Sequence, residues 1–339
     1  RDRYTDEEIK DMSDEEYRNN LYSLWTNYCV SESYEPGSTF KPVTVASALE
    51  EGVVKDGDTY VCKGFETVAD YKLKCHVFST IGSHGSLTVE QALMNSCNPY
   101  MIHLALEMGN SRFAYYQSLF GFGKITGIDL PGETTGIVYG DRMTTIDAAC
   151  NSFGQTINVN MMQMMAAYCS IINGGMLYQP HIVKRIESAN GEVVKEYKAN
   201  LVRQTITAST SKLLRRYLKN TVEEGTAKKA GVTGYSVAGK TGTAQKGDRK
   251  DNKWIISFIG HAPAENPKFA IYVVIDEPYG TTGTSGSSAD VLTLTHNILE
   301  KLLPYMNVYK DASDEYEDTS SSPDELTVDG IPAGTASSN

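Results

Sequence analysis

Residues 34–52 of the sequence read YEPGSTFKPVTVASALEEG, a stretch that starts as a turn and ends as an apolar helix. The dipeptide Pro36-Gly37 breaks the chain, and Gly52 is typical of a helix end. We therefore expect a helix over residues 38–51. Where the turn meets this helix, a serine and a lysine lie three residues apart, which is a spacing that puts two side chains on one helix face.

Ser38 and Lys41 form this pair, and their position favours a nucleophile with its base. A serine at a helix start faces the positive end of the helix dipole, which stabilises a developing alkoxide. If apolar neighbours such as Phe40 exclude water from Lys41, the pKa of its amine falls and the free amine can take the serine proton. The pair alone also fits a capping serine beside a lysine that extends along the surface.

The Ser-x-x-Lys pattern is weak by itself, because about one match is expected by chance in roughly 300 residues. A second match joins Ser209 to Lys212. That match opens a predicted helix over residues 210–226, where a Ser or Thr is expected as the N-cap. Context therefore favours the first match, although spacing does not separate the two.

A Lys-Thr-Gly motif occurs once, on a predicted strand, and Thr243 follows it. Side chains alternate along a strand, so Lys240 and Gly242 are expected on one face and Thr241 and Thr243 on the other. The missing side chain of Gly242 is expected to let a substrate backbone approach.

A Ser-x-Asn motif occurs three times, at residues 96–98, 188–190 and 337–339. The second occurrence lies in the turn of a predicted hairpin, and the third lies in an acidic tail. The first lies at a break between two predicted helices, where a loop can present Ser96 and Asn98 to a cleft.

The remaining pattern predicts an α+β fold, with a long helical stretch followed by an antiparallel sheet. Residues 1–30 are expected to be partly helical, and the acidic, serine-rich chain from about residue 311 is expected to be disordered. We also expect helices over 88–109, with a break near Asn98-Pro99, over 160–175 and over 210–226, a hairpin over 181–198, and strands over 235–245, 253–263 and 268–278.

The net charge of −11 is concentrated at the two ends of the 339-residue chain. Residues 1–18 carry eight acidic and four basic side chains, residues 311–329 carry eight acidic and no basic ones, and residues 19–310 have a net charge of +1. Nucleic-acid binding needs clustered Lys and Arg, so we expect no nucleic-acid partner. No apolar run reaches the ~18 residues of a membrane-spanning helix.

The six cysteines form no Cys-x-x-Cys motif, which argues against a zinc site of the usual spacing. Cys62 and Cys75, with His76 and His84 near them in sequence, are compatible with a disulfide or a metal site. Unpaired buried thiols are the commonest alternative, and the compartment of the protein decides between these possibilities.

Four stretches occur in order along the chain: YEPGSTFKP (34–42), HGSLTVEQALMNSCNPY (84–100), GFGKITGIDLPGE (121–133) and GYSVAGKTGTAQ (234–245). Together they resemble the transpeptidase domain of class B penicillin-binding proteins, over about residues 25 to 303. The resemblance implies the α+β fold shared with serine β-lactamases, an antiparallel sheet flanked by helices with a helical subdomain. It divides the chain into a polar N-terminal segment (1–24), a transpeptidase domain (25–306) and an acidic tail (307–339).

The resemblance implies that Ser38 attacks the penultimate D-Ala carbonyl of a peptidoglycan stem peptide, releases the terminal D-Ala and forms an acyl-enzyme. Lys41 is then the base, Ser96 relays a proton to the leaving amine, and Asn98 holds Lys41 and the substrate amide. An amine of a neighbouring stem peptide takes the acyl group and forms the crosslink. β-Lactams imitate D-Ala-D-Ala and are expected to acylate Ser38.

By the same resemblance, the motif around Gly242 lines the opposite wall. There Lys240, Thr241 and Thr243 receive the terminal carboxylate of the substrate through positive charge and hydroxyl groups. The backbone N–H groups of Ser38 and Thr243 form the oxyanion hole. No metal and no organic cofactor is implied.

Members of this family carry a membrane helix, a non-catalytic pedestal and the first strands of the catalytic sheet upstream of the matching region. We therefore expect these parts to precede the present sequence. The implied location is the extracytoplasmic face of the bacterial cytoplasmic membrane, and the implied partners are a membrane glycan polymerase and the division or sporulation machinery. The stretch NVNMMQ (158–163) departs from the family's usual Thr-Pro pair, a difference of the loop and not of the chemistry.

Three further activities share these motifs. A class A β-lactamase needs a glutamate that holds the deacylating water, commonly in an E-x-x-L-N pattern, and residues 99–239 contain no such pattern. Glu133, in PGETTG, follows the penicillin-binding pattern instead. The remaining two are a D,D-carboxypeptidase and a β-lactam sensor or scaffold domain without turnover. Release of D-Ala from a stem peptide separates a sensor from a transpeptidase.

Overall fold

A computed structural model describes residues 5–247, 253–278 and 287–311 of the chain. The predicted disordered tail, with the Ser-x-Asn motif at 337–339, lies almost entirely outside the described residues. Within the described residues, no helix combines the length and the apolar character needed to cross a membrane.

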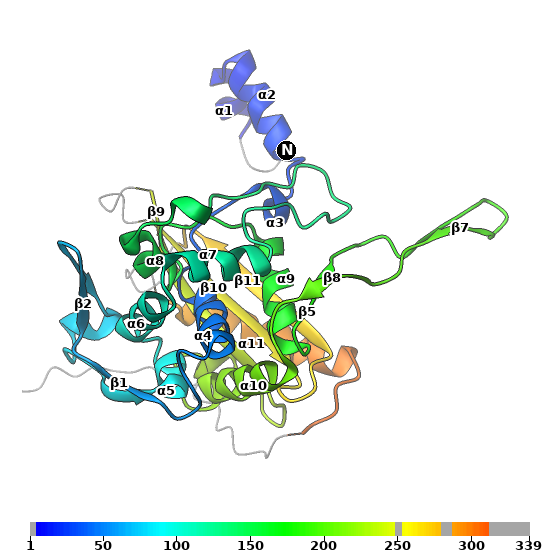
Figure 1. Cartoon of the computed structure of the whole chain (residues 1–339). Coiled ribbons are helices and arrows are strands. Elements are labelled where there is room, and N and C mark those ends of the chain that lie inside the picture. Colours follow the sequence, from blue (N-terminus) through cyan, green and yellow to red (C-terminus); the bar gives the residue numbers. More distant parts are fainter. Residues whose placement is uncertain (1–4, 248–252, 279–286, 312–339) are drawn as a thin grey trace, which may run out of the picture.

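A three-stranded antiparallel sheet forms the centre of the fold, in the order β11-β10-β9. Its strands are β9 (Ala238–Lys246), β10 (Lys253–Ala262) and β11 (Phe269–Asp276). This order confirms the predicted meander. Side chains alternate along β10, so Ile256 and Phe258 pack towards helix α11 whereas Ile259 packs towards the other helices. The sheet is therefore a layer between α11 and the helical part of the chain (Figure 1).

Helices on both sides of the sheet and small strand pairs at the periphery complete the fold (Figure 1). The α-helices are α1 (Asp6–Asp11), α2 (Asp14–Ser23), α3 (Tyr28–Ser31), α4 (Lys41–Glu51), α5 (Val89–Met94), α6 (Asn98–Met108), α7 (Asn110–Leu119), α8 (Thr145–Asn151), α9 (Met161–Ile172), α10 (Ala208–Glu223) and α11 (Ala289–Tyr305). The 3-10 turns are η1 (Gly37–Phe40), η2 (His76–Ser79), η3 (Gly140–Arg142) and η4 (Lys228–Ala230). The peripheral pairs are β1 (Thr59–Cys62) with β4 (Gly85–Thr88), β2 (Phe65–Val68) with β3 (Tyr71–Lys74), β5 (Met176–Gln179) with β8 (Asn200–Gln204), and β6 (Arg185–Glu187) with β7 (Val193–Glu196).

Helix α4 is a central helix and is buried from Lys41 to Ala48. The turn η1 precedes it, so the helix expected over 38–51 begins with a tighter 3-10 turn. Gly52 ends α4 in the left-handed conformation, with φ of 76°, as the sequence predicts. Burial on nearly all sides makes the first turn of α4 a rigid support for the residues around Ser38.

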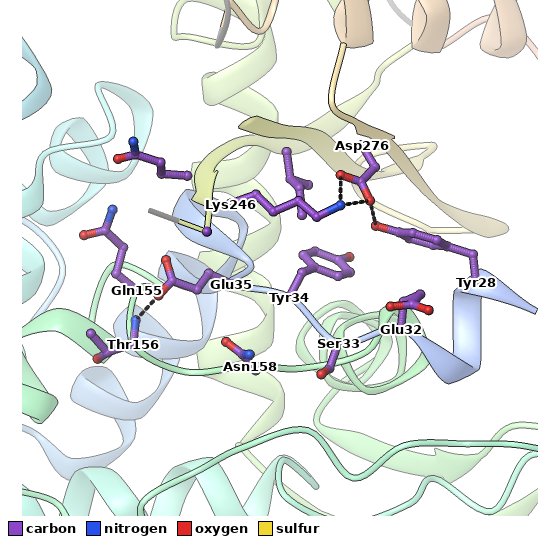
Figure 2. Close-up of a pocket in the computed structure, with 13 residues that line it drawn as sticks. Tyr28, Glu32, Ser33, Tyr34, Glu35, Gln155, Thr156, Asn158, Lys246 and Asp276 are labelled. Atoms are coloured by element: carbon purple, nitrogen blue, oxygen red, sulfur yellow. Dashed lines mark hydrogen bonds and ion pairs between the residues drawn. The ribbon is translucent and has the colours of Figure 1, made fainter. Parts of the chain in front are cut away.

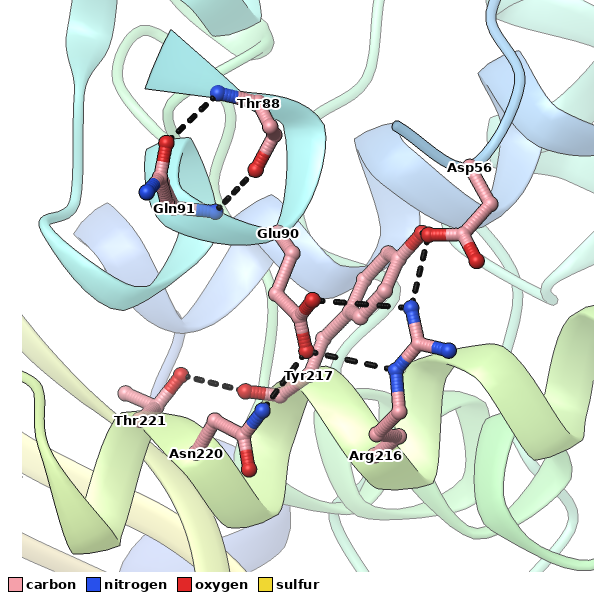
Figure 3. A network of polar contacts seen from close by, with 8 residues as sticks. All are labelled: Asp56, Thr88, Glu90, Gln91, Arg216, Tyr217, Asn220 and Thr221. Carbon is pink, nitrogen blue, oxygen red and sulfur yellow. Dashed lines mark hydrogen bonds and ion pairs between the residues drawn. The ribbon is translucent and has the colours of Figure 1, made fainter. Parts of the chain in front are cut away.

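The helix expected over 88–109 is interrupted as predicted, because α5 ends at Met94 and α6 begins at Asn98. Helix α10 packs against α5, and polar contacts join the two helices (Figure 3). Glu90 of α5 forms an ion pair with Arg216 and accepts a hydrogen bond from Asn220. The loop that follows α5 is therefore anchored to α10.

The peripheral strand pairs differ in how well the sequence predicted them. The hairpin expected over 181–198 is confirmed by β6 and β7, which form an exposed arm (Figure 1). The pairs β1–β4 and β2–β3 were not predicted, because each strand has four residues and most of their side chains are exposed or half-buried.

Candidate active site

Gly37 brings the turn that carries Ser38 against strand β9. Its backbone has a φ of +56°, and its N–H donates a hydrogen bond of 2.9 Å to the Gly154 carbonyl oxygen. A Cβ atom at this position would lie 2.5 Å from the Thr243 carbonyl oxygen, so only glycine fits without displacement. Ser38 is thereby held beside the strand that carries the Lys-Thr-Gly motif.

Lys41 is fully buried at the start of α4, and its amine has three hydrogen-bond acceptors. The Nζ atom donates to the Ser96 carbonyl oxygen at 2.6 Å, the Ser96 Oγ at 3.0 Å and the Asn98 Oδ1 at 2.7 Å. Burial lowers the pKa of Lys41 to about 8, although the electrostatic interactions with Cys75 and then Cys97 act in the opposite direction. An amine with this pKa is partly unprotonated near neutral pH, as a base must be.

Ser96 connects Lys41 to Ser38. Its Oγ accepts a hydrogen bond from Lys41 Nζ and donates one to the Ser38 Oγ at 2.9 Å. Ser96 has a φ of +53°, a conformation that costs a non-glycine residue about 1–3 kcal/mol. The path from Lys41 to Ser38 thus passes through Ser96, which the Ser-x-x-Lys spacing alone did not predict.

Asn98 is the first residue of α6, and both ends of its amide group are bonded. The Oδ1 atom accepts from Lys41, and the Nδ2 atom donates to the Lys74 carbonyl oxygen at 3.3 Å. The structure therefore brings together the four residues expected from the sequence to be catalytic: Ser38, Lys41, Ser96 and Asn98.

Strand β9 forms the opposite wall, with the alternation expected of it. Thr241 and Thr243 line the cavity, whereas Lys240 is fully buried. Lys240 Nζ donates to the Thr241 carbonyl oxygen at 3.3 Å and to the Thr241 Oγ1 at 3.4 Å. Burial, and next the positive charge of Lys41, hold the pKa of Lys240 well below its usual value. Lys240 therefore reaches the cavity through the Thr241 hydroxyl.

Gly242 packs closely against the neighbouring strand and the turn η1. A Cβ atom there would lie 2.4 Å from the Ser257 Oγ, 2.8 Å from the Thr39 Cγ2 and 2.9 Å from the Pro36 carbonyl oxygen. Its missing side chain therefore leaves room for Ser257 and for the turn η1. Gly242 thus has a packing role, since the close approach of η1 places Ser38 beside β9.

The two walls enclose a cavity of about 420 Å³. It is lined by Ser38, His76, Ser96, Asn98, Phe153, Gln155, Thr226, Thr241, Thr243, Trp254 and Ser288. Thr226 bridges the walls, because its Oγ1 donates to the Met94 carbonyl oxygen at 3.2 Å and lies 3.4 Å from the Thr241 Oγ1. Thr226 was not expected from the sequence to line the cavity, since a lone threonine at the end of the helix predicted over residues 210–226 carries no local signal.

A second cavity, of about 380 Å³, shares Gln155 with the first (Figure 2). Near the end of β9, Lys246 donates to both carboxylate oxygens of Asp276 at 2.9 Å. The Tyr28 hydroxyl donates to the same carboxylate at 3.1 Å. The second cavity thus lies near the end of β9, and its lining includes a positively charged side chain, Lys246, and a negatively charged one, Asp276.

The competing matches to the short motifs have structural roles. Thr207 caps α10 with its side-chain oxygen, and Ser209 Oγ lies 2.9 Å from the Thr207 Oγ1. Ser188 lies in the β6–β7 turn, where its Oγ accepts a hydrogen bond of 3.2 Å from the Glu192 N–H. Neither Ser209 nor Ser188 lines the cavity that contains Ser38.

A serine on the turn before a buried helix, a buried lysine connected to it by a second hydroxyl, and a facing Lys-Thr-Gly strand define a serine acyl-transfer site of the penicillin-binding protein and β-lactamase type. The family model for the penicillin-binding protein transpeptidase domain matches residues 4–300, and the chain belongs to this family. This match confirms the resemblance and the fold class inferred from the sequence.

Curated relatives agree with this assignment. Stage V sporulation protein D of Bacillus subtilis is 41% identical over 288 residues, which cover 83% of this chain and 44% of that protein. Peptidoglycan D,D-transpeptidase FtsI of Escherichia coli K12 is 32% identical over 292 residues, which cover 84% of this chain and 46% of that protein. The chain thus spans less than half the length of these two relatives.

Solved structures share the fold. Penicillin-binding protein 3 of Mycobacterium tuberculosis in complex with aztreonam has a TM-score of 0.76 and 29% identity, and the match covers 85% of this chain and 66% of that chain. The D,D-transpeptidase domain of a peptidoglycan glycosyltransferase from Eggerthella lenta has a TM-score of 0.76 and 27% identity, with 87% and 71% covered.

Proposed function

We propose that this chain is the catalytic domain of a peptidoglycan D,D-transpeptidase that uses a Ser38 acyl-enzyme and is inhibited by penicillin. The observation that carries this proposal is the continuous hydrogen-bonded path from Lys41 through Ser96 to Ser38, which ends in a cavity walled by β9. Family membership and the names of the relatives support the reaction class.

In the first half-reaction, the Ser38 Oγ attacks the penultimate D-Ala carbonyl carbon. The Ser38 proton passes through the Ser96 hydroxyl to the free amine of Lys41. When the peptide C–N bond breaks, the proton returns along the same path to the leaving D-Ala nitrogen. The acyl group stays on Ser38, and Lys41 is again a free amine.

In the second half-reaction, an amine of a neighbouring stem peptide replaces D-Ala. It attacks the ester carbonyl of the acyl-enzyme, and its proton passes to Lys41 by the same hydroxyl. The Ser38 ester bond then breaks and Ser38 takes its proton back. One difficult amide exchange thus becomes two steps through an activated serine.

The backbone around Ser38 supports an oxyanion hole. Gly37 lies against the Thr243 backbone, so η1 and β9 approach each other closely at Ser38, and the N–H groups of Ser38 and Thr243 would form the hole. Preorganised donors of this kind contribute about 3 kcal/mol each to acyl transfer in serine hydrolases. The Thr241 and Thr243 hydroxyls line the same cavity and would receive the terminal carboxylate of the substrate, with Lys240 behind Thr241.

The wider setting follows from the family and stays a proposal. We place the protein at the extracytoplasmic face of the bacterial cytoplasmic membrane, held by an N-terminal helix upstream of these residues. Its partners would be a membrane glycan polymerase and the division or sporulation machinery. The names of the two curated relatives, a stage V sporulation protein and FtsI, support this setting.

The test of the proposed reaction is release of D-Ala from a synthetic stem pentapeptide, with and without an amine acceptor, by the wild type and by Ser38→Ala. A transpeptidase releases D-Ala and forms a crosslinked product whose mass is measured. Acylation by benzylpenicillin without D-Ala release would identify a sensor instead, and rapid turnover of benzylpenicillin would identify a β-lactamase.

A further inference from the structure

Three cysteines and one histidine converge behind the active site. The sulfur atoms of Cys62, Cys75 and Cys97 and a ring nitrogen of His84 all lie within 4.8 Å of one another. The His84 Nδ1 lies 3.5 Å from the Cys75 Sγ and 3.8 Å from the Cys62 Sγ. The three cysteines are almost completely buried, with exposed fractions of 1%, 3% and 0%.

We infer that this cluster, formed by Cys62, Cys75, His84 and Cys97, binds one Zn²⁺ ion in a closed tetrahedral site. With Zn–S bonds of about 2.3 Å and a Zn–N bond of about 2.0–2.1 Å, a regular tetrahedron has S···N edges of about 3.6 Å. The two S···N distances of 3.5 and 3.8 Å lie on either side of that value. His84 therefore already stands at the spacing from Cys62 and Cys75 that the ion requires, and all four donor atoms lie within 4.8 Å of one another.

The donor set selects the metal. Three thiolates and one imidazole suit zinc, and four protein ligands leave no open position, as in structural zinc sites. On binding, the three thiols release their protons to solvent and the ion remains Zn²⁺, so no oxidant or reductant is needed. The site is thus a structural one, and the ion takes no direct part in acyl transfer.

Backbone N–H groups surround the sulfurs, as is usual around metal-bound thiolates. Gly64 donates to Cys62 at 3.4 Å. The Asn98 N–H donates to Cys75, and the Tyr100 N–H donates to Cys97. Such outer partners orient the ligands of metal sites and stabilise their negative charge.

The local fold explains what the ion would stabilise. The four ligands lie at the end of β1, just after β3, just before β4 and just before α6. The strands between them have four residues each and bury few side chains. A segment with so small a core gains stability from a metal crosslink.

The site also touches the catalytic loop, a link that rests on the proposed function. Cys97 is the middle residue of the Ser-x-Asn motif, between Ser96 and Asn98. Cys75 follows Lys74, whose carbonyl oxygen accepts the Asn98 amide. A zinc ion would therefore hold both sides of this loop and act as a positioning element for the Ser96 hydroxyl.

A disulfide, a metal site and unpaired thiols are all compatible with the sequence around Cys62 and Cys75. The structure places Cys97 beside Cys62, Cys75 and His84 as a fourth ligand. A disulfide between Cys62 and Cys75 would not explain the position of Cys97. In the part of the chain that the structure describes, no disulfide joins any of the cysteines. A disulfide would remove two of the four ligands, so a disulfide and a zinc site exclude each other.

The test is the metal content of the chain purified under reducing conditions with zinc, measured by elemental mass spectrometry and native mass spectrometry. The variants are Cys62→Ser and His84→Ala, and the matched control is Cys29→Ser, a thiol outside the cluster. We expect one zinc per chain in the wild type and the control, and zinc affinity at least about tenfold lower in the two variants. A metal-free wild type, or equal affinity in Cys62→Ser, would overturn the site.

Titration of the wild type with Co²⁺ keeps the test valid if the variants fold poorly. Thiolate-to-cobalt charge-transfer bands with a tetrahedral ligand-field spectrum are expected, and their absence contradicts the site. Removing zinc with a chelator should slow benzylpenicillin acylation at least about tenfold, and zinc should restore it. An unchanged acylation rate would overturn the positioning role, whereas one bound zinc with no acylation at all would instead count against the proposed function.

Discussion

The Ser96 Oγ lies 2.9 Å from the Ser38 Oγ, although 58 residues separate the two serines in sequence. Ser96 is also bonded to Lys41, so its hydroxyl connects the base to the nucleophile. The strained backbone of Ser96 follows α5, which the contacts of Glu90 anchor to α10 (Figure 3). The reactivity of Ser38 therefore depends on a loop that is distant in sequence.

Ser96→Ala is expected to slow acylation of Ser38 by about 10²–10⁴-fold, because the proton path to Lys41 is cut. Thermal unfolding should change little, since the lost hydroxyl is small and lies at the cavity. The measurement is the acylation rate with a fluorescent penicillin. The control is Ser188→Ala, from the second Ser-x-Asn motif, and acylation of Ser96→Ala at the wild-type rate would contradict the path.

The acylation rate should rise with pH and level off above about 8, the pKa of Lys41 in the folded protein. The rate rises with pH because only the free amine of Lys41 accepts the Ser38 proton. Burial lowers the pKa of Lys41, so this amine loses its proton at a lower pH than an ordinary lysine. The other titratable groups around Lys41 are Lys240, Cys75, Cys97 and His76. Stopped-flow acylation across pH 6–10 tests this, and a rate that is flat or falls over this range would rule out Lys41 as the base.

Gly37→Ala should abolish acylation, because its Cβ would lie 2.5 Å from the Thr243 carbonyl oxygen and push η1 away from β9. The control is Gly57→Ala, which has a similar positive φ but no neighbour within 4 Å. Both variants carry backbone strain, so both should lose about 1 kcal/mol of unfolding free energy or more. If Gly57→Ala lost acylation as completely as Gly37→Ala, strain and not the contact with β9 would explain the effect.

Thr241→Val keeps the shape of the side chain and removes the hydroxyl that faces the cavity. We expect kcat/KM for D-Ala release to fall about tenfold or more for a peptide with a free terminal carboxylate, because a hydrogen bond to a charged group is lost. For the same peptide ending in a carboxamide the change should be small. Equal losses for both peptides would show that Thr241 does not bind the carboxylate.

Strong local patterns predicted α4, α5, α6, α9 and α10, the three-stranded sheet and the residues that meet in the catalytic half of the candidate site, whereas α7, α8 and α11 were not predicted. Gly52 and the Thr88 cap of α5 mark helix ends by their own chemistry, and the three long strands alternate clearly. Ser96 and Asn98 could be selected because only their copy of the motif lies at a break between helices. Such signals are contained within a few residues of sequence.

The features that were missed depend on contacts between distant segments. The contact of Gly242 with the turn η1 was not predicted, because the packing of η1 on β9 is invisible in a strand pattern. Thr226 lines the cavity because its side chain contacts Met94 and Thr241, which are distant from it in sequence. The role of Cys97 beside Cys75 is of the same kind, since no spacing rule joins them.

The most direct test of the central claim is the intact mass of the chain after incubation with benzylpenicillin, followed by mapping of the modified peptide. The proteins to compare are the wild type, Ser38→Ala and Ser209→Ala, the serine of the competing Ser-x-x-Lys match. We expect one stable adduct on Ser38 in the wild type and in Ser209→Ala, and none in Ser38→Ala. An adduct that persists in Ser38→Ala, or one that maps to another residue, would contradict the assignment of Ser38 as the nucleophile.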